Sequence, residues 1–209
     1  MNNLFLRLEE EFSKPLPGAE AQRRMSPSLR RQVQNQESVK KGGVLILLYP
    51  YRDNLYTVLI KRAEYEGIHS GQVSFPGGMY EKGDHSLAYT AMREAMEETG
   101  MSPVTVTVIG QLTPLHIPVS NILVFPFAAV SHRRPDFVHD PSEVQYLIET
   151  PISELLNPQN CKTKIMHILG EAIEVPYFDI QDNHIWGATA MIISEFLEVI
   201  RNSGVKFAL

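Results

Sequence analysis

Two apolar runs joined by a short polar segment constrain the fold of this 209-residue chain more than any other feature. The runs lie at residues 43–49 (GVLILLY) and 55–61 (LYTVLIK), and the residues 50–54 between them (PYRDN) favour a turn. Apolar, partly β-branched runs on both sides of a tight turn predict an antiparallel β-hairpin. We therefore expect a β-sheet that includes this hairpin.

The rest of the chain predicts further strands and fewer helices. Strand patterns follow at residues 72–75, 104–112, 122–130 and 183–186, and a second hairpin at 164–177 turns near Gly170. Helical patterns lie at about residues 86–99 and 188–201, and a short helix follows Pro151. Because two helices are long enough to cover sheet faces, the sequence predicts an α/β (α+β) fold with a largely antiparallel or mixed sheet.

Composition excludes several classes of protein. The chain has 19 basic and 24 acidic residues and a net charge of −5, which argues against broad electrostatic binding to nucleic acid. A local cationic site or a metal would still allow a small anionic ligand. No apolar stretch approaches about 18 residues, so we expect no membrane span.

Cysteine usage bears on the compartment. The single cysteine, Cys161, excludes an intramolecular disulfide framework and a multi-cysteine zinc site. The first residues (MNNLFLRLEEEF) carry acids where a signal peptide needs an uninterrupted apolar run. A free thiol without a secretory signal predicts a cytoplasmic protein.

The segment at residues 75–101 (FPGGMYEKGDHSLAYTAMREAMEETGM) is the most informative about chemistry. At 100° per residue, the small and apolar side chains of its predicted helix share one arc, namely Ala88, Ala91, Met92, Ala95, Met96 and Thr99. The opposite arc holds Arg93, Glu94, Glu97 and Glu98. Because Glu94 and Glu98 are one turn apart, three carboxylates share a helix face.

Two interpretations of these acids are open. One is a solvated acidic face, and the other is a site for a hard divalent cation, which takes several carboxylate oxygens and relieves their repulsion. The flanking residues favour the cation site. Gly77 and Gly78 follow Pro76 and allow the backbone to approach a ligand closely, and Gly100 stands where a helix C-cap is expected.

This segment resembles the signature of the Nudix hydrolases, which runs glycine, five residues, glutamate, seven residues, then Arg-Glu-aliphatic-x-Glu-Glu-x-Gly-aliphatic. Residues 93–101 (REAMEETGM) match its second half at every polar and glycine position. In the first half, Gly78 lies fifteen residues before Arg93 instead of fourteen, and Asp84 replaces the usual glutamate. This departure is similar to the coenzyme A pyrophosphatase branch.

Sequence on both sides of the signature resembles the same branch. Arg62-Ala63, Gly71 and residues 75–78 (FPGG) stand at the branch's spacings. The later segments 141–144 (PSEV) and 185–190 (IWGATA) also look like motifs of the branch. Gly67 stands where the branch has a second arginine, which removes one expected phosphate contact.

The resemblance covers about residues 42–200 and implies two parts. Residues 42–209 are expected to form the Nudix hydrolase domain, an α/β/α sandwich with a mixed sheet flanked by helices. Residues 1–41 are expected to form a partly helical N-terminal arm. The arm either lies on the domain, contributes to a homodimer, or is a partly ordered tail.

The resemblance also implies a site that uses Mg²⁺ or Mn²⁺. Glu94, Glu97 and Glu98 are the implied metal ligands, and a backbone carbonyl near Gly78 adds to them. Arg93 is implied to orient a glutamate, its plain alternative being an ion pair on the helix surface.

Other residues have more open roles. Glu143 is a candidate general base, and a glutamate of the helix is the alternative base. Glu143 is otherwise an ordinary surface acid. Arg62 is expected to meet a substrate phosphate, and Gly77 and Gly78 to line the substrate site. Asp84 either supports the metal ligands or caps the helix, which is the commoner use of aspartate there.

The implied function is hydrolysis of a nucleoside diphosphate linked to another moiety. Coenzyme A or an acyl-CoA is the best single substrate, giving 3′,5′-ADP and (acyl-)4′-phosphopantetheine. One alternative is a Nudix hydrolase of a dinucleotide, sugar nucleotide or nucleoside triphosphate. Another is a Nudix-like module that senses a nucleotide without cleaving it, which predicts eroded glutamates. The expected partner is therefore a small-molecule nucleotide.

Overall fold

The expected hairpin lies at the centre of an eight-stranded mixed sheet in the computed structural model, which describes residues 2–28, 39–64, 66–67, 69–168 and 170–205. Its strands are β1 (Lys40–Tyr51) and β2 (Asn54–Arg62), which pair antiparallel. The turn residues Arg52 and Asp53 have φ of 45° and 61°. These left-handed values match the twist of a two-residue hairpin, so this prediction is confirmed.

Away from the turn, β1 and β2 separate, and a glycine-containing segment fills the space between them. β3 (Val73–Ser74) pairs with the end of β2, and β4 (Gly77–Met79) pairs with the start of β1. β2 and β1 each pair with another strand on their outer side, so β3 and β4 lie inside the sheet. This splay places the Pro-Gly-Gly turn at the open end of the hairpin.

Four more strands complete the sheet. They are β5 (Val106–Gln111), β6 (Leu115–Ile117), β7 (Ile122–Ser131) and β8 (Val144–Pro151). β7 runs parallel to β1, whereas β8 pairs antiparallel with β2, and β5 and β6 pair antiparallel with β7. The sequence shows no clear strand pattern at β4, β6 or β8, because β4 and β6 have only three residues and β8 mixes polar residues and a proline with apolar ones.

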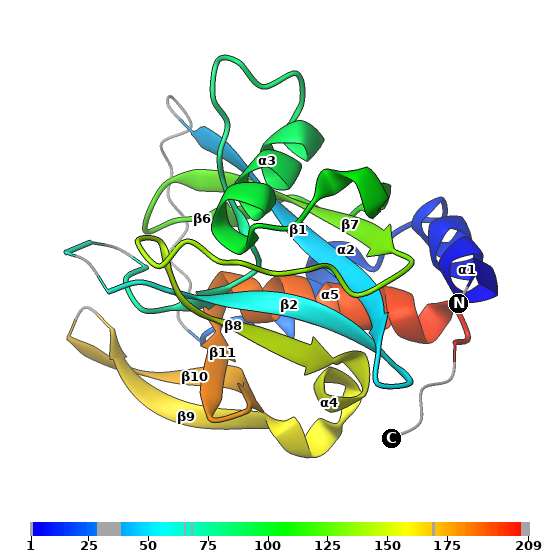
Figure 1. The fold of residues 1–209 in the computed structure, drawn as a ribbon. Coiled ribbons are helices and arrows are strands. Elements are labelled where there is room, and N and C mark those ends of the chain that lie inside the picture. Colours follow the sequence, from blue (N-terminus) through cyan, green and yellow to red (C-terminus); the bar gives the residue numbers. More distant parts are fainter. Residues whose placement is uncertain (1, 29–38, 65, 68, 169, 206–209) are drawn as a thin grey trace.

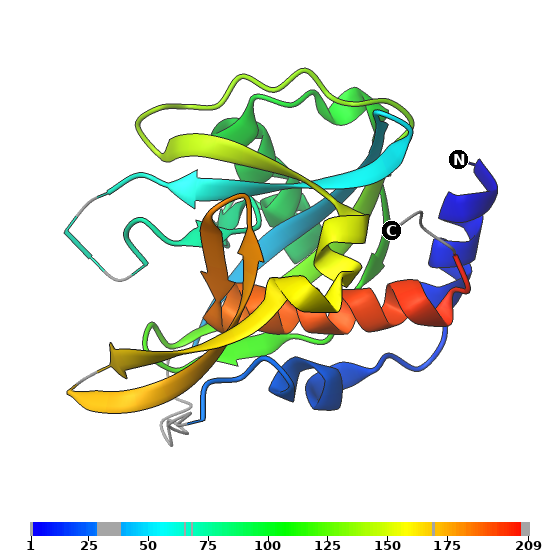
Figure 2. The ribbon, with the colours of Figure 1, turned by 90° about the horizontal axis from the view of Figure 1, so that it is seen from below.

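A separate three-stranded sheet consists of β9 (Cys161–Ile168), β10 (Glu171–Ile180) and β11 (Asn183–Trp186). β9 and β10 form the expected second hairpin, and Gly170 between them has a φ of 84°. The hairpin extends away from the rest of the molecule near the start of α5 (Figures 1 and 2).

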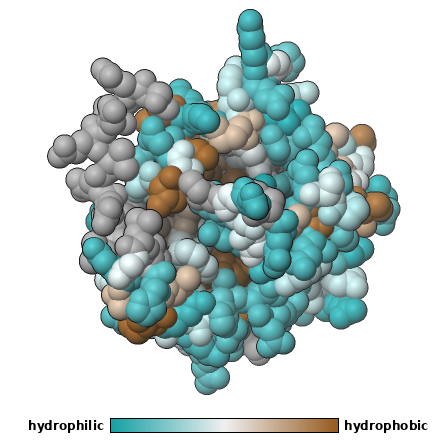
Figure 3. Space-filling view, turned by 90° about the vertical axis from the view of Figure 1, so that its left-hand side faces the viewer, coloured by the Kyte–Doolittle hydropathy of each residue, from teal (hydrophilic) through white to brown (hydrophobic). Residues whose placement is uncertain are grey.

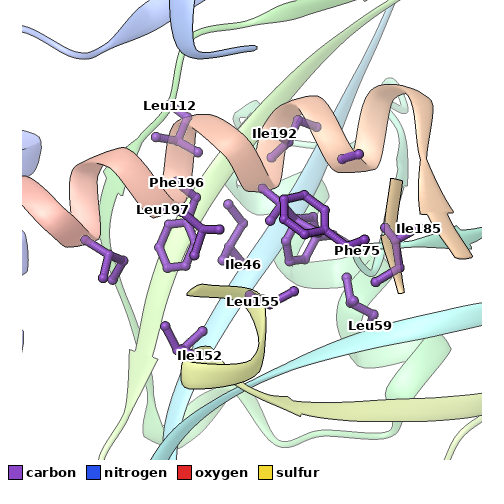
Figure 4. Packing of buried hydrophobic residues seen from close by; sticks show 14 of the residues in the cluster. Ile46, Leu59, Phe75, Leu112, Ile152, Leu155, Ile185, Ile192, Phe196 and Leu197 are labelled. Atoms are coloured by element: carbon purple, nitrogen blue, oxygen red, sulfur yellow. The ribbon is translucent and has the colours of Figure 1, made fainter. Parts of the chain in front are cut away.

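Two long helices cover opposite faces of the main sheet, α3 (Leu87–Thr99) and α5 (Gly187–Asn202) (Figures 1 and 2). Alternate residues of β1 divide between two apolar clusters. Leu45 and Leu47 lie with Ala91 and Ala95 on the α3 side, and Ile46 lies with the α5 side chains drawn in Figure 4. The α/β/α sandwich expected from the sequence is confirmed.

Shorter elements connect these layers. α4 (Ile152–Leu156) and the 3-10 turns η1 (Pro103–Thr105) and η2 (Pro158–Asn160) each span one turn or little more. Over the part of the chain that is described, none of the helices has the length and apolarity to cross a bilayer.

The N-terminal segment contains α1 (Asn2–Phe12) and α2 (Gly18–Arg23), and both contact the domain. Phe5, Leu8, Ala21 and Met25 are buried. The fully buried Glu195 of α5 accepts hydrogen bonds from Gly18 N (3.1 Å), Gln22 Nε2 (2.8 Å) and both Thr113 donors (2.7 and 3.2 Å). Residues 2–28 therefore lie on the domain, while residues 29–38 of the expected arm are outside the described residues.

Candidate active site

The Pro-Gly-Gly turn lies against the acid-bearing face of α3. Gly77 has a φ of 153°, and a Cβ there would collide with the backbone of β1. A Cβ on Gly78 would fall on the carboxylate of Glu94. Both positions therefore require glycine, because Gly77 packs against β1 and Gly78 packs against the Glu94 side chain of α3.

Glu98 is buried beneath this turn. Its side chain is 1% exposed, and its oxygens accept hydrogen bonds from Gly77 N (2.8 Å) and Arg62 Nη1 (3.1 Å). Of the two interpretations of these acids, the solvated face is therefore wrong for Glu98, because β4 and the Pro-Gly-Gly turn cover the last turn of α3. The pKa of Glu98 is raised to about 7. Burial is the main cause and the charges of Glu94 and Glu143 add to it, whereas Gly77 N–H and Arg62 act in the opposite direction.

Arg93 connects three carboxylates of the site. Its Nε contacts Asp84 Oδ1, Nη2 contacts Glu94 Oε1 and Nη1 contacts Glu97 Oε2, each at 3.0 Å. Nη2 also donates to the carbonyl oxygen of Met79 in β4 (3.3 Å). Arg93 thus contacts two of the glutamates and connects α3 to β4, and its expected role of orienting a glutamate stays a prediction.

Asp84 does not cap α3, so that prediction is wrong. The N-cap is Ser86, whose Oγ accepts from the backbone N–H of Tyr89 (3.1 Å). Asp84 instead accepts from Arg93, from Thr90 Oγ1 (2.7 Å) and from Glu81 N (3.0 Å). The Arg93 guanidinium is the main cause that holds the pKa of Asp84 well below its usual range.

Asp84 therefore holds Arg93 in place, and Arg93 in turn contacts Glu94 and Glu97. Thr90 contributes to this support, and no sequence signal marked it beforehand. The helix ends as expected, with Gly100 in the left-handed region at a φ of 68°.

Glu143 lies immediately before β8, next to the end of β2. Its carbonyl oxygen accepts from Ala63 N (2.9 Å), and its N–H donates to Asp140 O (3.2 Å). The side chain is exposed, and its charge is among the causes that raise the pKa of Glu94 and Glu98. The fold thus brings Glu143 into electrostatic range of the helix glutamates, which sequence spacing alone did not establish.

The face of the molecule that Figure 3 shows is hollowed. Figure 3 views the left-hand side of Figure 1, which carries the loop between β2 and β3 and the tip of the β9–β10 hairpin. Hydrophobic residues lie in the hollow and mostly hydrophilic residues surround it (Figure 3).

The family model described as "NUDIX domain" matches residues 40–164. The chain belongs to the Nudix family. Two plant relatives from Arabidopsis thaliana are similar to it: "Nudix hydrolase 15, mitochondrial" is 34% identical over 74% of this chain and 56% of its own length. "Nudix hydrolase 22, chloroplastic" is 34% identical over 77% of this chain and 55% of its own length. This Nudix chain thus spans about half the length of these two relatives.

A bacterial relative of similar size matches as well. The "Uncharacterized Nudix hydrolase NudL" of Photorhabdus laumondii is 33% identical over 69% of this chain and 76% of its own length. The solved MutT protein of Methanosarcina mazei shares the Nudix fold, with a TM-score of 0.53, 15% identity and coverage of 83% of this chain and all of the other. The Nudix hydrolase RenU of M. smegmatis shares it as well, with a TM-score of 0.52, 13% identity and coverage of 82% of this chain and 90% of the other.

The donor chemistry of this Nudix site suits a divalent cation, although the carboxylates are turned toward arginines. In the described residues, no three His, Cys, Asp or Glu side chains form a group that could hold a metal ion as they stand. Glu94 and Glu97 contact Arg93, and Glu98 contacts Arg62. Hard carboxylate oxygens whose charges repel each other are nonetheless the ligands that Mg²⁺ and Mn²⁺ prefer. The residues present therefore fit such an ion.

Proposed function

We propose that this chain is a metal-dependent Nudix pyrophosphohydrolase that cleaves a nucleoside diphosphate linked to another moiety. Its best substrate is coenzyme A or an acyl-CoA, cleaved to 3′,5′-ADP and (acyl-)4′-phosphopantetheine. The observation that carries the proposal is the cluster in which Arg93 and the Pro-Gly-Gly turn hold Glu94 and Glu98 side by side. The names of the relatives support the hydrolase class.

Glu94, Glu97 and Glu98 are the residues that would hold Mg²⁺ or Mn²⁺. The bound ion supplies positive charge that offsets the charge of the diphosphate and activates a water. Arg93 keeps Glu94 and Glu97 in place through its two contacts at 3.0 Å.

The remaining residues handle the substrate and the proton. Glu143 accepts the proton of the attacking water on its exposed carboxylate. The water oxygen bonds to one phosphorus while the bridging P–O bond breaks, and the leaving phosphate oxygen carries the electron pair. Arg62 and the backbone at Gly77 and Gly78 bind the diphosphate.

One observation favours a different nucleotide. Gly67 stands where the coenzyme A branch has an arginine, so one phosphate contact expected for coenzyme A is missing. A dinucleotide, sugar nucleotide or nucleoside triphosphate is therefore the second candidate. The sensing module is disfavoured because Glu94, Glu97 and Glu98 are all present. The expected homodimer and cytoplasmic location also remain proposals, which sedimentation and cell fractionation would test.

The test is a panel of substrates with Mg²⁺ and Mn²⁺. The protein is incubated in ¹⁸O-water with coenzyme A, NADH, diadenosine polyphosphates, ADP-ribose and nucleoside triphosphates. The products are separated by chromatography and their masses are measured by mass spectrometry. We expect coenzyme A to be cleaved fastest, with ¹⁸O in one phosphate product. Glu98→Gln should lower the rate by orders of magnitude, whereas Glu9→Gln on the exposed surface of α1 should not. If no substrate is cleaved, the proposal that the chain is a hydrolase is refuted. If ADP-ribose is cleaved faster than coenzyme A, the assignment of coenzyme A as the substrate is refuted.

A further inference from the structure

Arg62 is bound to a proposed metal ligand instead of pointing into solvent. Its Nη1 lies 3.1 Å from Glu98 Oε1, and its side chain is 27% exposed. Among the carboxylates that the structure describes, Glu98 is the one that Arg62 contacts. The residue expected to bind substrate phosphate thus neutralises a residue expected to bind the metal.

The backbone of Arg62 is held firmly while its side chain reaches the protein surface. Arg62 N–H donates to Gln72 O (3.0 Å). The pairing of β2 with β8 shifts register between Lys61 and Arg62, so that Lys61 is opposite Tyr146 and Arg62 is opposite Val144. Such bulges redirect side chains next to active sites. The long side chain can therefore change partners without moving the strand.

A metal ion and Arg62 would compete for Glu98. Its second oxygen, Oε2, already accepts from Gly77 N–H at 2.8 Å, which leaves Oε1 as the oxygen shared with the guanidinium. Two cations at one carboxylate repel each other, and the burial of Glu98 leaves little water to screen that repulsion. A divalent ion at Glu98 therefore favours release of Arg62.

Arg93 provides the contrast within the same site. It contacts Asp84 as well as Glu94 and Glu97, and the Asp84 side chain is only 2% exposed. If the glutamates turn toward an ion, the buried aspartate still holds Arg93. Arg62 has no such second anchor among the described carboxylates, so it is the mobile cation of the pair.

We propose that Arg62 is a switch between the two ligands of the reaction. It neutralises Glu98 until a divalent ion binds there, and it then moves to the diphosphate of the substrate, whose geometry suits a planar guanidinium. This inference rests on the proposed function and deepens it. It predicts that metal binding and diphosphate binding favour each other through Arg62. The metal releases Arg62 from Glu98 so that it can bind the diphosphate, and the diphosphate holds Arg62 away from Glu98 so that the metal can bind there.

The test measures binding without hydrolysis, by calorimetry on the full chain after EDTA treatment and dialysis, at about pH 9, where the Glu98 carboxyl with its pKa of about 7 is ionised with or without Arg62. Mg²⁺ is titrated into wild type, Arg62→Met and the matched control Lys61→Met, whose charge change is the same one residue away. The magnesium complex of imidodiphosphate, which resists hydrolysis, is then titrated into the Mg²⁺-saturated proteins.

Opposite effects on the two ligands are the expected signature. Arg62→Met should bind Mg²⁺ several-fold more tightly, because the competing cation is gone, and should bind the imidodiphosphate complex about tenfold more weakly, because a charged hydrogen bond is lost. Lys61→Met should change neither by more than about twofold, since its charge does not contact Glu98. Unchanged or weaker Mg²⁺ binding by Arg62→Met would overturn the switch, and unchanged imidodiphosphate binding would overturn the transfer to substrate.

A second measurement covers the case in which Arg62→Met does not fold. Nitrogen-15 spectra of the arginine Nε–H groups of wild type are recorded during the Mg²⁺ titration, with Arg62→Lys used for assignment. The Arg62 signal should shift or exchange while the Arg93 signal keeps its slow exchange with water. An unmoved Arg62 signal at saturating Mg²⁺ contradicts the switch alone, whereas a wild type that binds no Mg²⁺ contradicts the proposed function as well.

Discussion

Glu98→Gln should stabilise the protein in EDTA at neutral and alkaline pH. Glu98 has its pKa raised from 4.5 to about 7 by burial, so the native state holds its proton more tightly than the unfolded chain. Between pH 4.5 and 7 the unfolding free energy therefore falls as pH rises. Each pKa unit corresponds to about 1.4 kcal/mol, which gives a cost of about 1 kcal/mol at pH 5 and about 3 kcal/mol at pH 8.

The glutamine side chain of Glu98→Gln removes the cost of ionising a buried carboxyl group, but it introduces an unfavourable contact. Glu98 accepts hydrogen bonds at both oxygens, from Arg62 and Gly77, so the NH₂ of a glutamine faces a donor and costs about 1 kcal/mol. We expect Glu98→Gln to be nearly neutral at pH 5 and to raise the unfolding free energy by about 2 kcal/mol at pH 8.

Urea denaturation in EDTA, followed by circular dichroism and the fluorescence of the single tryptophan, Trp186, measures this difference. Glu97→Gln is the matched control, because it removes the same charge from a side chain that is 55% exposed and should change stability by less than about 0.5 kcal/mol. If the difference in unfolding free energy between Glu98→Gln and wild type is the same at pH 8 as at pH 5, the buried carboxylate carries no such cost.

Three further predictions test other parts of the structure. Gly78→Ala places a methyl group on the carboxylate of Glu94 and should weaken Mg²⁺ binding about tenfold in calorimetry, whereas Gly83→Ala, whose Cβ meets nothing within 4 Å, should leave it unchanged. Gly43→Ala drives a Cβ into the backbone of α3 and should lower the unfolding free energy by about 1–3 kcal/mol, and an unchanged urea midpoint would contradict that close contact. Glu195→Ala removes the acceptor that binds α2 and should lose about 3 kcal/mol, with faster hydrogen exchange at residues 18–22 as the local readout; unchanged exchange there would mean that α2 is held by its apolar contacts alone.

The elements that carry strong local patterns were predictable. The hairpin of β1 and β2, the helix α3 and the strand at residues 183–186 follow from periodicity and turn residues that neighbours in sequence supply. Where a pattern needs partners from elsewhere, prediction failed. β4 has three residues and exists because it pairs with the start of β1.

The N-cap of α3 shows a nearer limit. Asp84 and Ser86 are both good capping residues two positions apart. The Arg93 guanidinium and the Thr90 hydroxyl bind the buried Asp84 carboxylate, so Ser86 is the N-cap of the helix. A local propensity could not distinguish these outcomes, because the partners lie six and nine residues away from the aspartate.

By itself, the sequence determined which residue types share one face of α3, because a helix of 3.6 residues per turn places Glu94 and Glu98 together in any context. Only the tertiary structure decided that Glu98 is buried and paired with Arg62, since that arginine is 36 residues away at the end of another element. Burial depends on what covers a helix face, here the Pro-Gly-Gly turn that the separating strands β1 and β2 admit between them. The pattern of charges is local, but their pKa values and partners are properties of the assembled fold.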